Sequence, residues 1–107
     1  MAKSCDAGCP DEAKSVKNHM LNPKDAKDAS SRLKLLAHPT RLQILKILSK
    51  KDQCVCVFSD ALGKRQPNIS QHLAKLKDNG IIESYMKGKY AYYSLKDKKI
   101  RKLVESI

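Results

Sequence analysis

The stretch that decides the fold is QCVCVFSDALGKRQPNISQHLAKLKDNGII, at residues 53–82. Its segment VFSDALG predicts a short helix that ends at Gly63, because glycine is common just past a helix C-terminus. The letters KRQ predict a tight turn, and Pro67 suits the first turn of a second helix. Asn79 and Gly80 end that second helix. The stretch therefore predicts two short helices joined by a tight turn.

The second of these helices has two different sides. Ile69, Leu73 and Leu76 fall on one stripe and are predicted to face inward. The opposite side carries Gln71, Ala74, Lys75 and Asp78, with Asn68 and Ser70 on its flanks. Such a helix can bury one side and offer polar groups to a partner on the other.

Upstream, the segment KDASSRLKLLAHPTRLQILKILSK at residues 27–50 carries the strongest helical pattern of the chain. Proline disfavours the helical conformation at the residue before it, so His38 and Pro39 divide this run into two helices. Downstream, IIESYMKGKYAYYSL at residues 81–95 is rich in Ile and Tyr and predicts strands, with a hairpin turn at 87–89.

The last twelve residues, KDKKIRKLVESI, predict a final helix with Ile100, Leu103, Val104 and Ile107 on one side. The order of elements predicts a mainly α (α+β) fold. It is the order of a winged helix-turn-helix with a two-stranded β-hairpin wing.

The first 24 residues are polar and are predicted to form a mobile arm with a short helix around residues 11–20. Residues 25–107 then form the winged helix-turn-helix domain. No apolar run approaches the roughly 20 residues that a membrane span needs, and the N-terminus has no apolar signal region. We therefore expect a cytoplasmic protein that has no membrane partner.

The charge of the chain favours a polyanionic partner. Its 107 residues include 22 Lys and Arg against 11 Asp and Glu, a net charge of +11. Such an excess is typical of proteins that bind nucleic acid, although a generally basic surface without that function is the alternative.

The second helix of the 53–82 stretch is suited to the major groove, where the first turns of a helix reach base edges. The residues that we predict to contact DNA lie on this helix, just before it and at the hairpin tip. They are Lys64, Arg65, Gln66, Asn68, Ser70, Gln71, His72, Lys75, Lys87 and Lys89. Each also has a simpler reading: His72 lies beside the apolar stripe and could pack there, and hairpin lysines often only solubilise.

Four cysteines suggest a thiolate site. Cys54 and Cys56, at the entrance of a helix, can converge, and a helix N-terminus favours the thiolate. Thiolates select soft or borderline ions such as zinc, cadmium, lead and arsenite. Two sulfurs are an incomplete shell, which Cys5 and Cys9 could finish.

Other readings of these cysteines remain open. A buried cysteine is often a small hydrophobic residue, and the thiols could instead form a reversible disulfide or persulfide. A third alternative, a thiol-based enzyme or a metal carrier, is not indicated, because the chain supplies neither a Cys-x-x-Cys redox motif nor a nucleophile paired with a base.

Several motifs together resemble the ArsR/SmtB family of metal-sensing repressors. These are LKLLAHPTRLQILKIL, QCVCVFSDALG, RQPNISQHLAKLKDNGII and YMKGKYAYYSL, within residues 31–104. The resemblance implies a homodimer that occupies an inverted-repeat operator in double-stranded DNA and represses until an inducer releases it. In that family the first and last helices form the dimer interface.

The resemblance also sharpens the reading of the cysteines. CVCVFSD occupies the place of the family's cysteine-containing metal motif, which assigns Cys54 and Cys56 as ligands. The added N-terminal pair, Cys5 and Cys9, resembles the cadmium- and lead-responsive branch, in which the arm of one subunit completes the site on the other. Arsenite remains open as the inducer. The family's second site, on the last helix, is not expected, because Lys99 stands where a histidine would fall.

Overall fold

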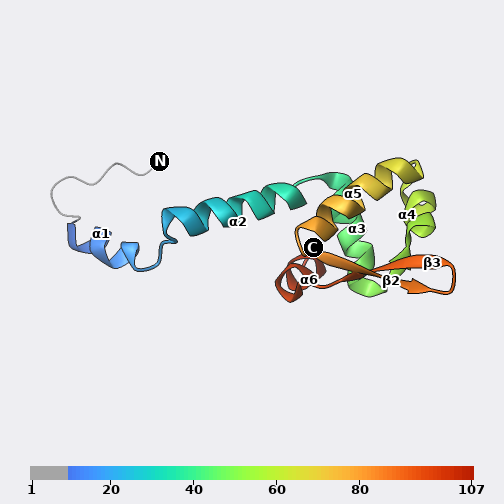
Figure 1. Ribbon diagram of the computed structural model, residues 1–107. Coiled ribbons are helices and arrows are strands. Elements are labelled where there is room, and N and C mark those ends of the chain that lie inside the picture. The colour runs from blue at the N-terminus through green and yellow to red at the C-terminus, as the bar shows by residue number, and fades with distance from the viewer. Residues whose placement is uncertain (1–9) are drawn as a thin grey trace. The chain divides into compact units, whose positions relative to one another are not determined.

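The computed structural model describes the backbone of residues 10–107 and the side-chain environments of residues 12–107. The elements, in chain order, are α1 (Pro10–Lys17), α2 (Pro23–Leu36), α3 (Pro39–Lys50), β1 (Gln53–Cys54), α4 (Val55–Leu62), α5 (Gln66–Asp78), β2 (Ile82–Lys87), β3 (Tyr90–Leu95) and α6 (Lys98–Glu105) (Figure 1). None of the helices in this described part is long and apolar enough to cross a bilayer.

The chain divides into two compact units, one reaching Arg32 and the other formed by Leu33–Ile107. In the first unit, α1 is the short helix predicted for the arm. The side chain of Asn22 caps the next helix by accepting a hydrogen bond from the Asp25 N–H at 2.8 Å. Helix α2 therefore begins at Pro23, directly after this cap.

In the second unit, one core gathers the apolar stripes of several helices. Ile44, Leu45 and Leu48 come from α3, and the predicted inward stripe of α5 is fully buried, as its amphipathic pattern indicated. Burial of these side chains removes apolar surface from water, which is the dominant favourable term in folding. The core thus holds α5 by one side and leaves the other side exposed.

Helix α6 closes this core. Ile100 and Val104 are buried, and Arg101 donates to the backbone carbonyls of Ser49 and Leu95, both at 3.0 Å. Two further members of the predicted apolar side, Leu103 and Ile107, stay 43% and 75% exposed. The C-terminal segment therefore keeps apolar surface that the rest of the described chain does not cover.

The sheet contains the predicted hairpin and one strand that the sequence pattern did not reveal. Strands β2 and β3 pair in antiparallel register, from Ile82 opposite Leu95 to Lys87 opposite Tyr90. Gly88 opens the two-residue turn with a φ of 65°, a value that glycine adopts without steric penalty. The short β1 adds to the other edge of β3, so the strand order is β1-β3-β2.

Candidate nucleic-acid interface and thiol pair

Helices α4 and α5 form the predicted helix-turn-helix, and one serine of α4 closes the turn between them. Gly63 takes the left-handed conformation, with a φ of 64°, just after α4 ends. The Lys64 N–H donates to the Ser59 carbonyl at 3.2 Å, and Ser59 Oγ donates to the Lys64 carbonyl at 2.6 Å. Pro67 lies in the first turn of α5, as predicted. The turn is thus held by bonds on both sides of Lys64.

The exposed side of α5 carries nearly all of the predicted groove-reading residues. Asn68, Ser70, Gln71 and Lys75 are exposed, and so are Lys64, Arg65 and Gln66 before them. Amide and hydroxyl side chains of this kind can donate to and accept from base edges. That these residues contact DNA stays a prediction, because the structure describes the protein alone.

His72 is the member of the predicted set that faces the protein. It is half-buried, its ring centroid lies 4.5 Å from that of His38, and its Nδ1 accepts a hydrogen bond from Arg41 Nε at 3.1 Å. Burial lowers the pKa of His72, and the nearby charges of His38, Arg41 and Lys64 act in the same direction. Its neutral form is therefore favoured, and the imidazole packs α5 against the start of α3.

Arg41 and His38 are residues that sequence reasoning missed. Arg41 also donates from Nη1 to the Leu35 carbonyl at 3.2 Å, and His38 Nδ1 accepts from the Thr40 N–H at 3.2 Å. His38 thereby caps α3, while Arg41 links the end of α2 to α5. No local pattern could reveal the bond between Arg41 and His72, because these residues are far apart in sequence and only the fold brings them together.

An open hollow of about 380 Å³ lies along the same side of α5. Arg41, Gln71, Lys75 and Asp78 contribute to its lining, together with His72 and Ala74. Two cationic side chains in a hollow beside the exposed helix suit a phosphate group, while the carboxylate of Asp78 opposes one.

In the wing, Lys87 and Lys89 are exposed at the tip. The Lys87 Nζ lies 5.4 Å from the centroid of the Tyr92 ring, within the range of a cation–π interaction. On α5, Lys77 donates to Ser84 Oγ of β2 at 2.8 Å. This bond joins α5 to β2 of the wing, so the two surfaces that are predicted to contact DNA are connected to each other.

Cys54 and Cys56 come together at the start of α4. Cys54 is the last residue of β1 and the residue that precedes the helix, while Cys56 is the second helical residue. A thiol hydrogen bond from Cys56 lowers the pKa of Cys54, with help from the backbone N–H groups of Val57 and Cys56, while burial opposes the shift. The same interaction raises the pKa of Cys56, and burial adds to that rise. Cys54 is therefore the first of the two to become a thiolate.

This geometry fits a thiophilic ion but does not complete its shell. Cys54 is 7% exposed and Cys56 is half-buried, so the pair is partly shielded from water. Within residues 12–107, no group of three or more His, Cys, Asp or Glu side chains is placed to hold an ion. The predicted ligands Cys5 and Cys9 lie outside the described residues.

On the last helix, Asp97 has a structural role. Its Oδ1 accepts from the N–H groups of Lys99 and Ile100 at 2.9 and 3.2 Å, which caps α6. The expectation that this helix has no second ion site stays a prediction.

Comparisons with known proteins bear on this combination of elements. Residues 38–84 match the family model "Bacterial regulatory protein, arsR family". The "Cadmium resistance transcriptional regulatory protein CadC" of Listeria innocua is 32% identical over 104 residues, which cover 94% of this chain and 87% of that protein. The "Arsenical resistance operon repressor" of Escherichia coli K12 is 43% identical over 63 residues, which cover 58% of this chain and 54% of that protein.

Among solved structures, "Reduced HlyU from Vibrio cholerae N16961" superimposes with a TM-score of 0.73 and 30% identity. The match covers 78% of this chain and 87% of that one. Similarity of sequence and of fold therefore lead to the same group of transcriptional regulators.

Proposed function

Because this chain belongs to the arsR family of bacterial regulatory proteins, we propose that it is a repressor that releases its operator when a soft metal or metalloid binds its cysteine thiolates. The coarser function follows from the family: the chain is a DNA-binding transcriptional regulator and not an enzyme. The inducer, the ligand set and the subunit arrangement are the parts that we propose.

The observation that carries the proposal is the convergence of Cys54 and Cys56 at the first helix of the helix-turn-helix. Two adjacent sulfurs, one of them readily ionised, are the donors that cadmium, lead, zinc and arsenite prefer. Since α4 leads through the turn at Gly63 into α5, an ion held at its start is well placed to disturb the reading helix.

Cys5 and Cys9 complete the site in this proposal. Arsenite needs about three sulfurs and zinc takes about four ligands, so at least one further ligand has to join the pair. The match to the cadmium resistance protein covers 94% of the chain and so includes most of the N-terminal 24 residues. A coordinating arm is consistent with such an alignment, and cadmium is accordingly the first ion to test.

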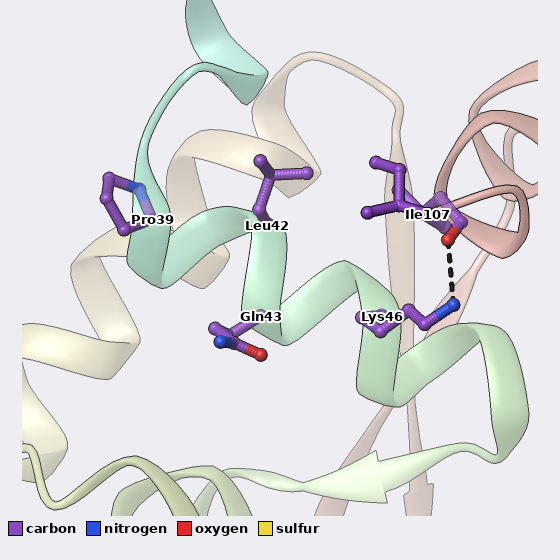
Figure 2. A pocket seen from close by; sticks show the side chains of 6 residues that line it. Pro39, Leu42, Gln43, Lys46 and Ile107 are labelled. Atoms are coloured by element: carbon purple, nitrogen blue, oxygen red, sulfur yellow. Dashed lines mark hydrogen bonds between the residues drawn. The ribbon is translucent and has the colours of Figure 1, made fainter.

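The proposed assembly is a homodimer on an inverted-repeat operator. Leu103 and Ile107 are exposed, and Ile107 lines an apolar hollow of about 280 Å³ between α3 and the end of α6 (Figure 2). Pro39, Leu42 and Val104 contribute to its lining, and Lys46 Nζ donates to the Val104 carbonyl at 3.0 Å at its edge. Covering this surface with a second copy would remove apolar area from water.

A twofold dimer would present two α5 helices about 34 Å apart, one turn of duplex DNA. Bases would be read by Asn68, Ser70 and Gln71, while Lys64, Arg65, Gln66 and Lys75 hold flanking phosphates and Lys87 and Lys89 of each wing add backbone contacts. A cytoplasmic location, where thiols are kept reduced, fits this role.

The test uses the full chain and a duplex selected by the metal-free protein. We expect cadmium chloride to weaken binding of this duplex, measured by fluorescence anisotropy, and to produce a thiolate-to-metal absorbance band. Replacing Cys54 and Cys56 by serine should abolish both effects and leave metal-free binding intact. Replacement of Cys5 and Cys9 should weaken the metal response. Release of the C54S/C56S variant by cadmium at the wild-type concentration would contradict the proposal.

A second candidate function keeps the fold and changes the signal. The hydrogen-bonded thiols favour it, because the lowered pKa of Cys54 favours its thiolate, and a thiolate beside a second sulfur can form a reversible disulfide or persulfide when an oxidant or a persulfide donor is supplied. Anaerobic titration separates the two functions: a metal sensor releases DNA with cadmium alone, whereas a redox sensor needs an oxidant or a persulfide donor.

A further inference from the structure

Strand β1 connects the thiol pair to the hairpin wing as well as to the helix-turn-helix. Cys54 lies at the junction of two elements, since it ends β1 and directly precedes α4. Through β1 it is paired with the wing: Gln53 is opposite Tyr93 and Cys54 is opposite Tyr92. Any displacement of Cys54 therefore acts on the sheet as well as on the helix.

We propose that ion capture at Cys54 moves the wing as well as the reading helix, and that Tyr92 is the positioning residue that transmits this movement to Lys87. This inference rests on the proposed function and extends it, because it names how the thiol site is connected to the DNA contacts. It adds a route that runs across the sheet and does not pass through α4 and α5.

Three side chains form a row across the sheet, which we call the cross-strand row: Cys54, Tyr92 and Tyr85. Cys54 is paired with Tyr92, and Tyr92 is paired with Tyr85. Side chains of paired residues project from the same face of a sheet, with Cβ atoms about 4.5–5.5 Å apart. The rings of Tyr92 and Tyr85 are stacked, with centroids 5.9 Å apart and an angle of 24° between planes. The row thus extends from the thiol to the outer strand of the hairpin.

The row also reaches the wing tip. Lys87 projects from the same face as Tyr85, two residues further along β2, and its Nζ lies 5.4 Å from the centroid of the Tyr92 ring. Tyr92 therefore lies opposite Cys54 on one side and beside Lys87, the cation that we predict to contact the DNA backbone, on the other. Its ring is half-buried, so its position depends on these neighbours.

A second tie connects the start of β1 to the same tyrosines. The Tyr85 hydroxyl donates to Asp52 Oδ2 at 2.9 Å, and Asp52 directly precedes β1. This bond spans β3, because β1 and β2 lie on opposite edges of that strand. Residues 52–54 are thus attached to the hairpin at both ends, by a hydrogen bond at Asp52 and by strand pairing at Cys54.

Ion capture has to disturb these attachments. Cys54 is buried, so an ion bonded to its sulfur at about 2.3 Å breaks the thiol hydrogen bond with Cys56 and has to displace groups around it. Closely packed side chains transmit such displacements and do not absorb them. Tyr92, as the paired neighbour, is the first member of the sheet to shift, and Lys87 loses its place above the ring.

The route across the sheet requires a change in the salt dependence of DNA binding. Each phosphate contact contributes about −0.9 to the slope of log affinity against log salt. If both wings of a dimer lose one lysine contact on cadmium binding, the slope should become shallower by about 2. A movement confined to base contacts of α5 would weaken binding and leave the slope unchanged.

The mutational test compares Tyr92→Leu with the matched control Tyr90→Leu. Tyr90 is an exposed tyrosine of the same strand that pairs with Lys87 and not with β1. Cadmium should weaken operator binding of the wild type and of Y90L by a factor within the about 5- to 150-fold range that is typical of coupled sites. For Y92L we expect the ratio of affinities without and with cadmium to fall to about 2 or less, with the absorbance titration unchanged.

Each possible result decides the matter. A wild-type ratio in Y92L, or a salt slope in the wild-type protein that cadmium does not change, would overturn the route through the sheet while leaving the metal sensor in place. Absence of the absorbance band in the wild type would overturn the proposed function itself. If Y92L does not fold, Tyr85→Phe keeps the stacked ring and removes the bond to Asp52, and it should lower the cadmium ratio by a smaller factor; an unchanged ratio would count against the proposal.

Discussion

Removal of the Arg41 guanidinium is expected to destabilise the fold and loosen α5, because this group bonds to two separate elements. Arg41→Met keeps the aliphatic stem and removes the donors to His72 Nδ1 and to the Leu35 carbonyl, at 3.1 and 3.2 Å. A hydrogen bond from a charged group contributes about 1.5–3 kcal/mol. Arg41 and His72 are both half-buried, so water can replace part of this, and about 1 kcal/mol for each bond is appropriate.

The expected loss is therefore about 2 kcal/mol in the free energy of unfolding, or a fall of about 10 °C in Tm for a domain of this size. Urea denaturation followed by circular dichroism measures it. Lys27→Met is the matched control, because it removes a cation of similar length from an exposed helical position and should change stability by less than about 0.5 kcal/mol.

A double-mutant cycle with His72→Phe identifies the partner. The phenylalanine keeps a ring beside His38 and has no nitrogen for Arg41, so Arg41→Met should cost about 1 kcal/mol less in that background. Equal costs in both backgrounds would show that the bond between Arg41 and His72 contributes nothing. A variant R41M as stable as the wild type would refute the whole account of this cluster.

Three further predictions concern protons, thiols and assembly. The pKa of His72 is lowered from its usual 6.5, so just below pH 6.5 the unfolded chain binds more protons than the folded chain. The free energy of unfolding should therefore fall as the pH drops through 6.5 towards the folded pKa. Urea denaturation should show a weaker fall for the His72→Phe variant. In a chain that retains only Cys54 and Cys56, Cys56→Ala removes the thiol donor and should raise the pH at which the thiolate absorbance of Cys54 appears; an unchanged titration would contradict the assigned hydrogen bond. Replacing the exposed Leu103 and Ile107 together by lysine should convert the proposed homodimer into a monomer in sedimentation, whereas Lys102→Glu, at an exposed position on the same helix, should not.

The candidate site was partly predictable, because most of its DNA-facing members follow from one amphipathic helix. The exposed polar side of α5 and the lysines of the wing were inferred from periodicity and turn residues, and the structure leaves them exposed. His72 was ambiguous in the sequence, since a residue beside an apolar stripe can turn either way. Its contact with Arg41 settles that it packs against α3 in the protein alone.

By itself, the sequence determined the helix-turn-helix, since the signals that define it are local. Glycine at position 63, proline at position 67 and the stripe of Ile69, Leu73 and Leu76 act within a few residues, through backbone dihedrals and the helical period. Tertiary structure alone decided the rest. A two-residue strand such as β1 has no period to detect, and the approach of Cys54 to Tyr92 depends on strand pairing between residues far apart in the chain.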